Sequence, residues 1–333
     1  MSEQGVSNLG VVDLLAKRPS TFDTWMAPDA GSASSQTQID RREKLSKKDF
    51  LHEYVLKNRP VVLKDAAEHW PALKKWTPQF FKEAYGDRKV PVFERKRSNS
   101  VKDMVLLRDY IDEITSGNFS NRAKYLFSLK IPQVFPELLP DLNPHPIYWE
   151  PNWLTSKHLL PGMPNFKLRN ITGLEMNMGG AGSPFPFLHY DDLWTQTFIT
   201  QVRGRKEWVM YEPDQTPYMY PSENAENISK IPMENDVNLN EFPLFAKATP
   251  LRFIVEEGEM LYGAPGWWHT TRALTPSIAV VLSTANGPIW SHVTKYSFLR
   301  AWRHPKWYLR PAALPIGAYL TAFHAVKSVT DPF

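Results

Sequence analysis

A series of short apolar segments, each bounded by turn residues, fills the second half of the chain and most restricts its fold. These segments are rich in β-branched and aromatic residues, a composition typical of strands. The expected strands lie at 167–178, 187–191, 197–203, 206–211, 251–256, 259–263 and 277–284. Several short strands separated by turns predict an antiparallel barrel or sandwich.

Two turns in this region look like tight hairpin connections. They are Arg203-Gly204-Arg205 and Glu256-Glu257-Gly258-Glu259, and each contains a glycine suited to a sharp reversal. Between them, the segment 212–250 is rich in Pro, Asn and Glu and shows little periodicity. A connection of that length is usually functional or mobile, so we expect one of these roles for it.

The first half of the chain combines helices with a few strands. Ser46 with Asp49, and Thr77 with Pro78, mark two helix starts, because a hydroxyl can cap a helix and proline fits its first turn. The remaining expected elements are a helix over 103–116 and strands at 61–63, 90–93 and 125–131.

We expect the chain to divide into three parts. Residues 1–45, rich in Ser, Asp, Thr and Gln, form a flexible arm. Residues 46–290 form the main domain, with a β core at about 166–290. The basic and aromatic extension 291–333 begins with a helix over 291–303. Interleaved rings and cations can bind nucleic acid, but a packing or dimer helix is the favoured interpretation.

Composition excludes several classes of site. The 333-residue chain has no cysteine, which excludes disulfides, thiolate nucleophiles, iron–sulfur clusters and cysteine-based zinc sites. Its net charge of +4 is only weak support for an anionic partner. The sequence shows neither a secretory signal nor an apolar run long enough to span a membrane. We therefore expect a cytoplasmic protein without a membrane contact, with the nucleus as a second location in a eukaryote.

One short run carries the side chains of a metal site. His189 and Asp191 are two positions apart, so on a strand both project from the same face. His269, in the run Gly266-Trp267-Trp268-His269, can complete the set from a distant strand. Two imidazoles and one carboxylate suit a non-haem iron(II) centre with open positions. Taken alone, the first pair is more typical of a strand-end histidine bonded to a carboxylate.

The ordered runs of the chain resemble a known family. The runs are His189-Tyr190-Asp191-Asp192, Gln201 to Lys206, Tyr211-Glu212-Pro213, Gly258 to Tyr262 and Pro265 to His269. Together they resemble the JmjC/cupin-8 hydroxylases, and most closely the asparaginyl hydroxylase that inhibits hypoxia-inducible factor. The likeness covers roughly residues 46–290. It implies a mainly β (α+β) fold, a double-stranded β-helix or jelly-roll with flanking helices.

The resemblance also assigns roles to single residues. It implies that His189, Asp191 and His269 hold Fe(2+), and that Lys206 pairs with the distal carboxylate of 2-oxoglutarate. Tyr125 sits where the family has a tyrosine touching that carboxylate. Thr197 and Ser283 replace asparagines of close relatives, so we expect altered contacts to the cosubstrate there. Relatives dimerise through C-terminal helices, which implies a homodimer.

The leading hypothesis is an Fe(II)/2-oxoglutarate-dependent oxygenase that hydroxylates a C–H bond and releases succinate and CO2. The expected target is an amino-acid side chain of a protein or peptide. Alternatives are an N-methyl-lysine demethylase, a hydroxylase of a free amino acid or other small molecule, and a non-catalytic cupin-like binding scaffold. A nucleic acid is not the expected partner.

Overall fold

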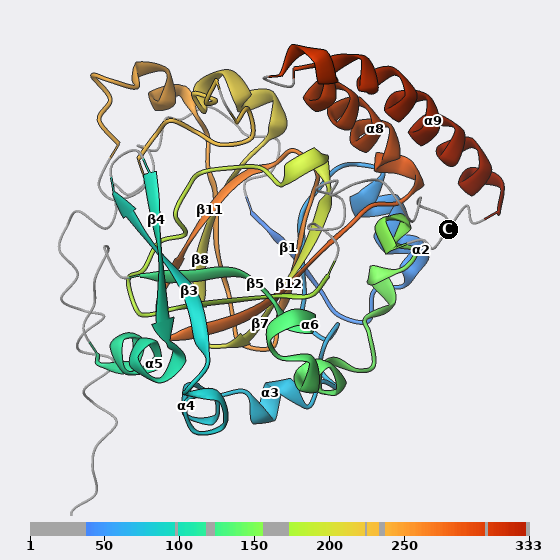
Figure 1. Ribbon diagram of the computed structural model, residues 1–333. Helices are drawn as coiled ribbons and strands as arrows, with labels where there is room; N and C mark the ends of the chain where they lie inside the picture. The colour runs from blue at the N-terminus through green and yellow to red at the C-terminus, as the bar shows by residue number, and fades with distance from the viewer. Residues whose placement is uncertain are drawn as a thin grey trace, which may run out of the picture.

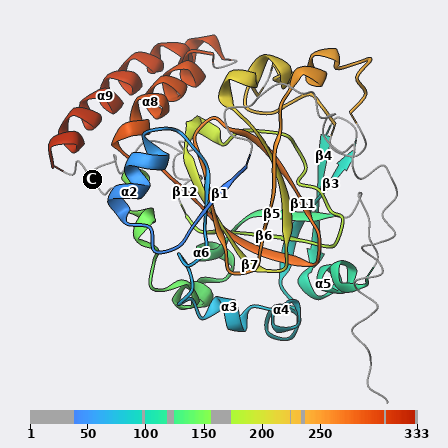
Figure 2. The same cartoon turned by 180° about the vertical axis from the view of Figure 1, so that it is seen from behind.

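Two β-sheets form the centre of the computed structural model, which describes residues 38–96, 99–117, 124–155, 173–223, 225–232, 237–303 and 306–330. The larger sheet has the strand order β1-β2-β10-β7-β12-β6-β5-β3-β4, and the smaller has the order β11-β8-β9 (Figures 1 and 2). The strands are β1 Asp40–Arg42, β2 Val61–Leu63, β3 Lys89–Lys96, β4 Asn99–Leu106, β5 Tyr125–Lys130, β6 Glu175–Gly179, β7 Gln196–Arg203, β8 Lys206–Tyr211, β9 Leu251–Val255, β10 Met260–Gly263, β11 Trp268–Ala273 and β12 Ser277–Thr284.

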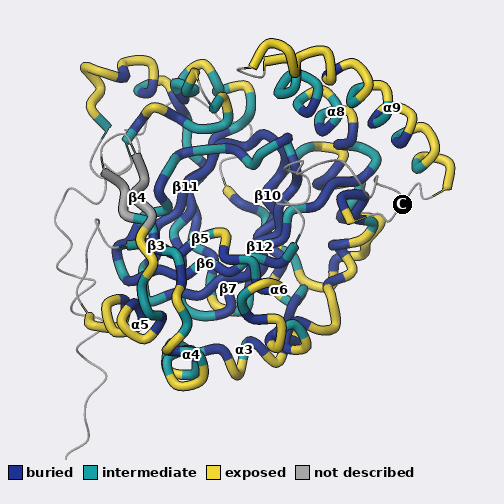
Figure 3. Tube along the Cα trace, in the orientation of Figure 1, coloured by how far each residue is buried: buried dark blue, intermediate teal, exposed yellow. Residues whose placement is uncertain are grey.

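Helices surround this core. The α-helices are α2 Lys47–Phe50, α3 Ala72–Lys75, α4 Pro78–Tyr85, α5 Leu107–Thr115, α6 Ile131–Val134, α8 Gly287–Trp302 and α9 Ala313–Thr330. The strands are mostly buried, whereas the outer faces of the helices are exposed (Figure 3). The predicted mainly β jelly-roll with flanking helices is confirmed. None of the helices within the described ranges combines the length and the hydropathy that a bilayer crossing requires.

The two predicted hairpin turns are wrong. Strands β7 and β8 follow each other in sequence but belong to different sheets, and the same holds for β9 and β10. Both turns are therefore corners at which the chain crosses between sheets. Gly204 (φ +75°) and Gly258 (φ +88°) give each corner its left-handed residue. A glycine turn reverses the chain in either case, so turn composition alone does not reveal which strand the chain joins next.

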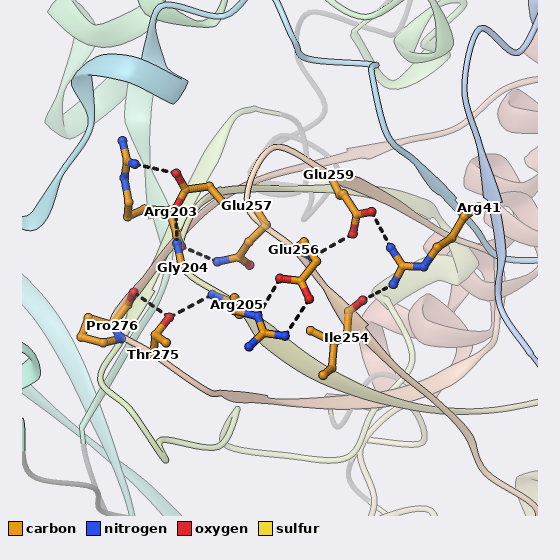
Figure 4. Close-up of polar contacts among 11 residues, drawn as sticks. Arg41, Arg203, Gly204, Arg205, Ile254, Glu256, Glu257, Glu259, Thr275 and Pro276 are labelled. Atoms are coloured by element: carbon orange, nitrogen blue, oxygen red, sulfur yellow. Dashed lines mark hydrogen bonds and ion pairs between the residues drawn. The ribbon is translucent and has the colours of Figure 1, made fainter. Parts of the chain in front are cut away.

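The two corners lie side by side and carry opposite charges (Figure 4). Arg205 makes a two-point contact with Glu256, with Nε–Oε2 and Nη2–Oε1 distances of 2.6 and 2.8 Å. Arg203 Nη1 lies 2.5 Å from Glu257 Oε1. Because these ion pairs are partly exposed, they add little to the folding free energy. Their main effect is to align the two corners.

Most expected elements are present, with shifted ends. The strands at 206–211 and 277–284 match β8 and β12, and the caps at Ser46 and Thr77 are confirmed by amide hydrogen bonds at 3.1 and 3.0 Å. The helix expected over 103–116 is wrong in its first part, because β4 continues to Leu106 and α5 starts at Leu107. The segment 167–172 lies outside the described residues.

The expected division into an arm, a main domain and a C-terminal extension stays a prediction, but the structure shows where regular elements begin and end near its boundaries. Residues 1–37 lie outside the described residues, but β1, within the expected arm, pairs in parallel with β2. The sheet therefore begins at Asp40 rather than after Ser46. At the other end, the helix expected over 291–303 is part of α8, and α8 and α9 lie side by side (Figure 1).

Candidate active site

A cavity of about 280 Å³ opens between the two sheets, and every site residue expected from the sequence lines it. These residues are Tyr125, His189, Asp191, Thr197, Lys206, His269 and Ser283. They come from strands β5, β7, β8, β11 and β12 and from the segment 187–191. The fold thus gathers side chains that are far apart in the sequence into one enclosure.

The two histidines are fixed by the backbone that carries them. The amide of His269 donates to the carbonyl of His189 at 2.6 Å, and the amide of His189 donates to the carbonyl of His269 at 3.0 Å. This isolated antiparallel bridge places His189 beside β11, at the edge of the smaller sheet. Potential ligand atoms of His189, Asp191 and His269 all lie within 4.8 Å of one another. One ion can therefore contact all three.

Each histidine also turns the same nitrogen toward the backbone. Nδ1 of His269 lies 2.9 Å from the carbonyl oxygen of Trp267, and Nδ1 of His189 lies 3.3 Å from that of Phe187. A carbonyl oxygen only accepts, so Nδ1 carries the proton in each ring and Nε2 keeps a lone pair for a metal. Burial and the neighbouring His269 hold the pKa of His189 well below its usual value. The neutral ring that binds metals is thereby favoured.

Lys206 is a buried cation without an anion. Only 1% of its surface is exposed, and its Nζ donates to the Tyr125 hydroxyl at 2.7 Å. Within the described ranges, no acidic side chain forms an ion pair with it. Burial lowers the pKa of Lys206 to about 7. An unpaired ammonium is costly in such a place, so the chemistry of the cavity fits an anionic group bound at Lys206.

The remaining expected residues lie close to this cation or to each other. Thr197 and Ser283 are register partners on β7 and β12, with their hydroxyl oxygens 3.4 Å apart. The ring of Tyr125 crosses the end of β6 at Gly179, where an added Cβ would lie 2.7 Å from the ring. The glycine-rich stretch after β6 therefore begins with a residue that admits Tyr125.

Several lining residues were missed by the sequence analysis. The ring of Phe185 stacks on that of His189 with centroids 4.8 Å apart, and Phe187 packs edge-on against both. Trp208 lies 5.7 Å from the His269 ring. The alternation of Phe185, Phe187 and His189 was the available signal, because residues two apart share one face of an extended segment.

The residues directly after Asp191 contact helix α8. The ring of Trp194 stacks on His292 and Tyr296 of α8 at 4.8 and 5.3 Å. Asp192 lines the cavity, yet its carboxylate receives both Nη atoms of Arg300 at 2.7 and 2.8 Å. Both side chains therefore connect the site to the C-terminal helices.

Replacing Gly266 with alanine will destabilise the fold through a contact with Trp194. Gly266 has φ +74°, and an added Cβ would lie 2.9 Å from the Trp194 ring. Gly258 has φ +88° and open space around it, so Gly258→Ala carries only the left-handed strain of about 1–2 kcal/mol. We expect Gly266→Ala to cost about 1–3 kcal/mol more, as overpacking does. Urea unfolding of both variants measures the difference, and equal losses would contradict it.

Comparison with known proteins gives consistent matches. A family model described as a cupin-like domain matches residues 47–282. The lysine-specific demethylase JMJ30 of Arabidopsis thaliana is 31% identical over 73% of this chain and 54% of its own length. The lysine-specific demethylase 8 of Xenopus tropicalis is 27% identical over 74% and 52%. The 2-oxoglutarate and iron-dependent oxygenase JMJD4 of Gallus gallus is 25% identical over 75% and 60%. The chain thus spans a little over half the length of these curated relatives.

Proposed function

The chain belongs to the JmjC/cupin-like domain family. From that premise we propose that it is an iron(II)- and 2-oxoglutarate-dependent oxygenase, and that it hydroxylates an amino-acid side chain of a protein or peptide. The observation that carries the proposal is the presence, in one cavity, of the His189–Asp191–His269 cluster and the unpaired ammonium of Lys206. The name of the Gallus gallus relative, a 2-oxoglutarate and iron-dependent oxygenase, supports it.

In this proposal, His189, Asp191 and His269 hold the metal on one face. When bound, iron(II) would supply the oxidation of a C–H bond by dioxygen, with 2-oxoglutarate as the co-reductant. One oxygen atom would enter the substrate as a hydroxyl group and the other would enter succinate, with release of carbon dioxide. The bonds from Nδ1 to backbone carbonyls orient both rings, so that Nε2 is the nitrogen that would bind the metal. The aromatic rings of Phe185 and Trp208 exclude water from the histidines.

The cosubstrate side of the cavity is assigned to Lys206 and its neighbours. Lys206 attracts the distal carboxylate as a point charge, and the Tyr125 hydroxyl, bonded to its Nζ, is a second partner. The hydroxyls of Thr197 and Ser283 line the same cavity and can each offer one hydrogen bond. Because a hydroxyl is shorter than the amide found in close relatives, we expect a water between one of them and the cosubstrate.

A neutral target is favoured over a methylated lysine. Besides Asp191, two acidic residues line the cavity, and each already pairs with a cation: Glu175 with Lys130, and Asp192 with Arg300. A methylammonium group would compete with these cations. N-methyl-lysine demethylation remains the second candidate, because two of the relatives are named lysine-specific demethylases. The resemblance to the asparaginyl hydroxylase stays a prediction, as does the hydroxylation of a small molecule.

The test is succinate formation with a peptide library, followed by mass spectrometry. Hydroxylation adds one oxygen to the peptide, whereas demethylation removes a methyl group and releases formaldehyde. Succinate without either change would indicate a small-molecule substrate. Metal binding without succinate, under every condition, would favour the non-catalytic scaffold and refute the proposal. Asp191→Ala is the matched inactive control.

Affinity for 2-oxoglutarate will fall as pH rises above about 7. In the ligand-free protein the pKa of Lys206 is about 7, and a bound carboxylate raises this pKa. Above pH 7 the free lysine is mostly neutral, so it must take up a proton when 2-oxoglutarate binds, and the affinity falls as protons become scarcer. Each pH unit between 7 and 9 should weaken binding up to about tenfold. Calorimetry of the Mn(II)-loaded protein with N-oxalylglycine, in buffers of different ionisation enthalpy, measures the proton directly. A dissociation constant that is flat over this range would contradict the expectation.

The C-terminal helices are proposed to form a homodimer, in a cytoplasmic protein. The support is apolar exposure: Trp307 of the 3₁₀ turn before α9 and Leu314 and Val329 of α9 are exposed by 74, 63 and 82%. Leu314→Arg should give a monomer by sedimentation velocity. Leu56→Arg, at a similarly exposed leucine elsewhere, should not. A monomeric wild type would end this proposal.

A further inference from the structure

The turn that follows Asp191 is held in an unfavourable backbone conformation. Leu193 and Trp194 have φ values of +57° and +56°, a region that side chains with a Cβ rarely adopt. Two such residues in succession persist only where their surroundings impose the conformation. Since they begin two positions after a proposed metal ligand, whatever imposes it also fixes where the Asp191 carboxylate points.

Helix α8 supplies those surroundings at all three positions of the turn. Arg300 donates two hydrogen bonds to the Asp192 carboxylate, at 2.7 and 2.8 Å. Leu193 is buried in the same apolar cluster as Ile289 and Trp290. A bidentate guanidinium–carboxylate contact fixes orientation as well as distance, so α8 restrains the turn in direction too.

The ring of Trp194 extends this restraint to the second metal-binding run. One part of the ring stacks on Tyr296 of α8, with planes 15° apart, and another lies against Gly266. Gly266 comes shortly before His269 in the chain. Trp194 therefore lies between α8 and the segment that carries the third ligand.

The residue that follows the last turn of α8, Arg303, connects to the metal motif through the 212–250 connection. Arg303 Nη1 lies 2.6 Å from Glu226 Oε2. The next residue, Asn227, accepts from the amide of Tyr190 through its carbonyl and donates from Nδ2 to the Tyr190 carbonyl, both at 3.1 Å. Tyr190 stands between the two proposed ligands of the first run. The 212–250 connection thus contacts the residue before Asp191, and α8 contacts the residue after it.

We propose that α8 positions the metal-binding carboxylate, with Arg300 as the principal positioning residue and Trp194 as the link to His269. The C-terminal extension is then part of the metal centre rather than an appendage to it. This inference rests on the proposed function, because it takes Asp191 to be a metal ligand.

The experiment measures Mn(II) affinity and the visible spectrum of the Co(II)-loaded full chain for Arg300→Met and Arg205→Met. Arg205 is a matched control, because it makes the same two-point contact with Glu256 at similar exposure, on the corner shown in Figure 4. We expect Arg300→Met to weaken Mn(II) binding about 10–100-fold, as loss of an outer-shell partner does, and to shift the Co(II) bands. Arg205→Met should do neither. The reversed pair Asp192→Arg with Arg300→Asp should recover part of the affinity.

Three results would overturn the inference. The first is wild-type Mn(II) affinity and an unchanged Co(II) spectrum in Arg300→Met. The second is equal weakening in Arg205→Met, which would point to general destabilisation. If Arg300→Met does not fold, Arg300→Lys takes its place, because lysine keeps the charge but cannot make the two-point contact with Asp192. A wild-type Mn(II) affinity and Co(II) spectrum in Arg300→Lys would again refute the inference. The third is a wild type that binds no Mn(II), which refutes the proposed function first and this inference with it.

Discussion

Asp191→Ala will abolish metal binding and, with it, succinate formation. The two imidazoles that remain, His189 and His269, carry no negative charge, so the variant loses the only anionic ligand of the cluster. Loss of an outer-shell partner typically costs about 10–100-fold in metal affinity, and removal of a direct ligand should cost more. Calorimetry with Mn(II) and a succinate assay on the same preparation measure both effects.

The control for this variant is a second carboxylate of the same cavity. Glu175 lines the cavity but pairs with Lys130, outside the cluster. Glu175→Gln should therefore bind Mn(II) with wild-type affinity. If Asp191→Ala bound the metal as tightly as Glu175→Gln does, the assignment of the three ligands would be wrong.

Lys206→Met will stabilise the ligand-free protein while removing its affinity for 2-oxoglutarate. Burial lowers the pKa of this lysine from 10.5 to about 7. At pH 8 the lysine of the unfolded chain is protonated, because its pKa lies about 2.5 units higher, whereas the buried lysine of the folded protein is mostly neutral. Losing this proton on folding costs on the order of 3 kcal/mol of folding free energy. Methionine has a similar volume and no charge, so the variant escapes this cost. Urea unfolding and N-oxalylglycine titration give the two results.

The stability gain has a defined pH dependence. The cost of the lowered pKa is greatest at and below pH 7 and disappears as pH rises toward 10.5, where the unfolded lysine also loses its proton. The difference between wild type and Lys206→Met should shrink accordingly. Lys130→Met is the opposite control, because Lys130 has a carboxylate partner in Glu175 and its loss should destabilise. A Lys206→Met protein less stable than wild type at pH 8 would contradict the expectation.

The site was more predictable from the sequence than the path of the chain. His189 and Asp191 stand two apart on an extended segment, so local spacing was enough to nominate them. The role of Lys206 was implied only by the family resemblance. Strand β11 was missed because its residues, Trp-His-Thr-Thr-Arg-Ala, read as polar although all six are buried. Residues that line a polar cavity do not follow the apolar alternation on which strand prediction depends.

Long-range partnerships explain the other errors. The corners at Gly204 and Gly258 look like hairpins because a turn motif does not encode which sheet the next strand joins. The contact between Asp192 and Arg300 was equally hidden, since the two residues come from different parts of the chain and neither has an unusual neighbourhood. Such contacts depend on tertiary structure, which short-range patterns do not contain.

The reciprocal amide bonds between His189 and His269 carry a consequence for how the protein acquires its activity. They join a segment before β7 to a strand after β10, so their formation closes a loop that contains strands of both sheets. Closing so large a loop is entropically slow. A chain that has not yet paired these two segments offers no preformed metal site, so we expect metal binding to depend on that pairing.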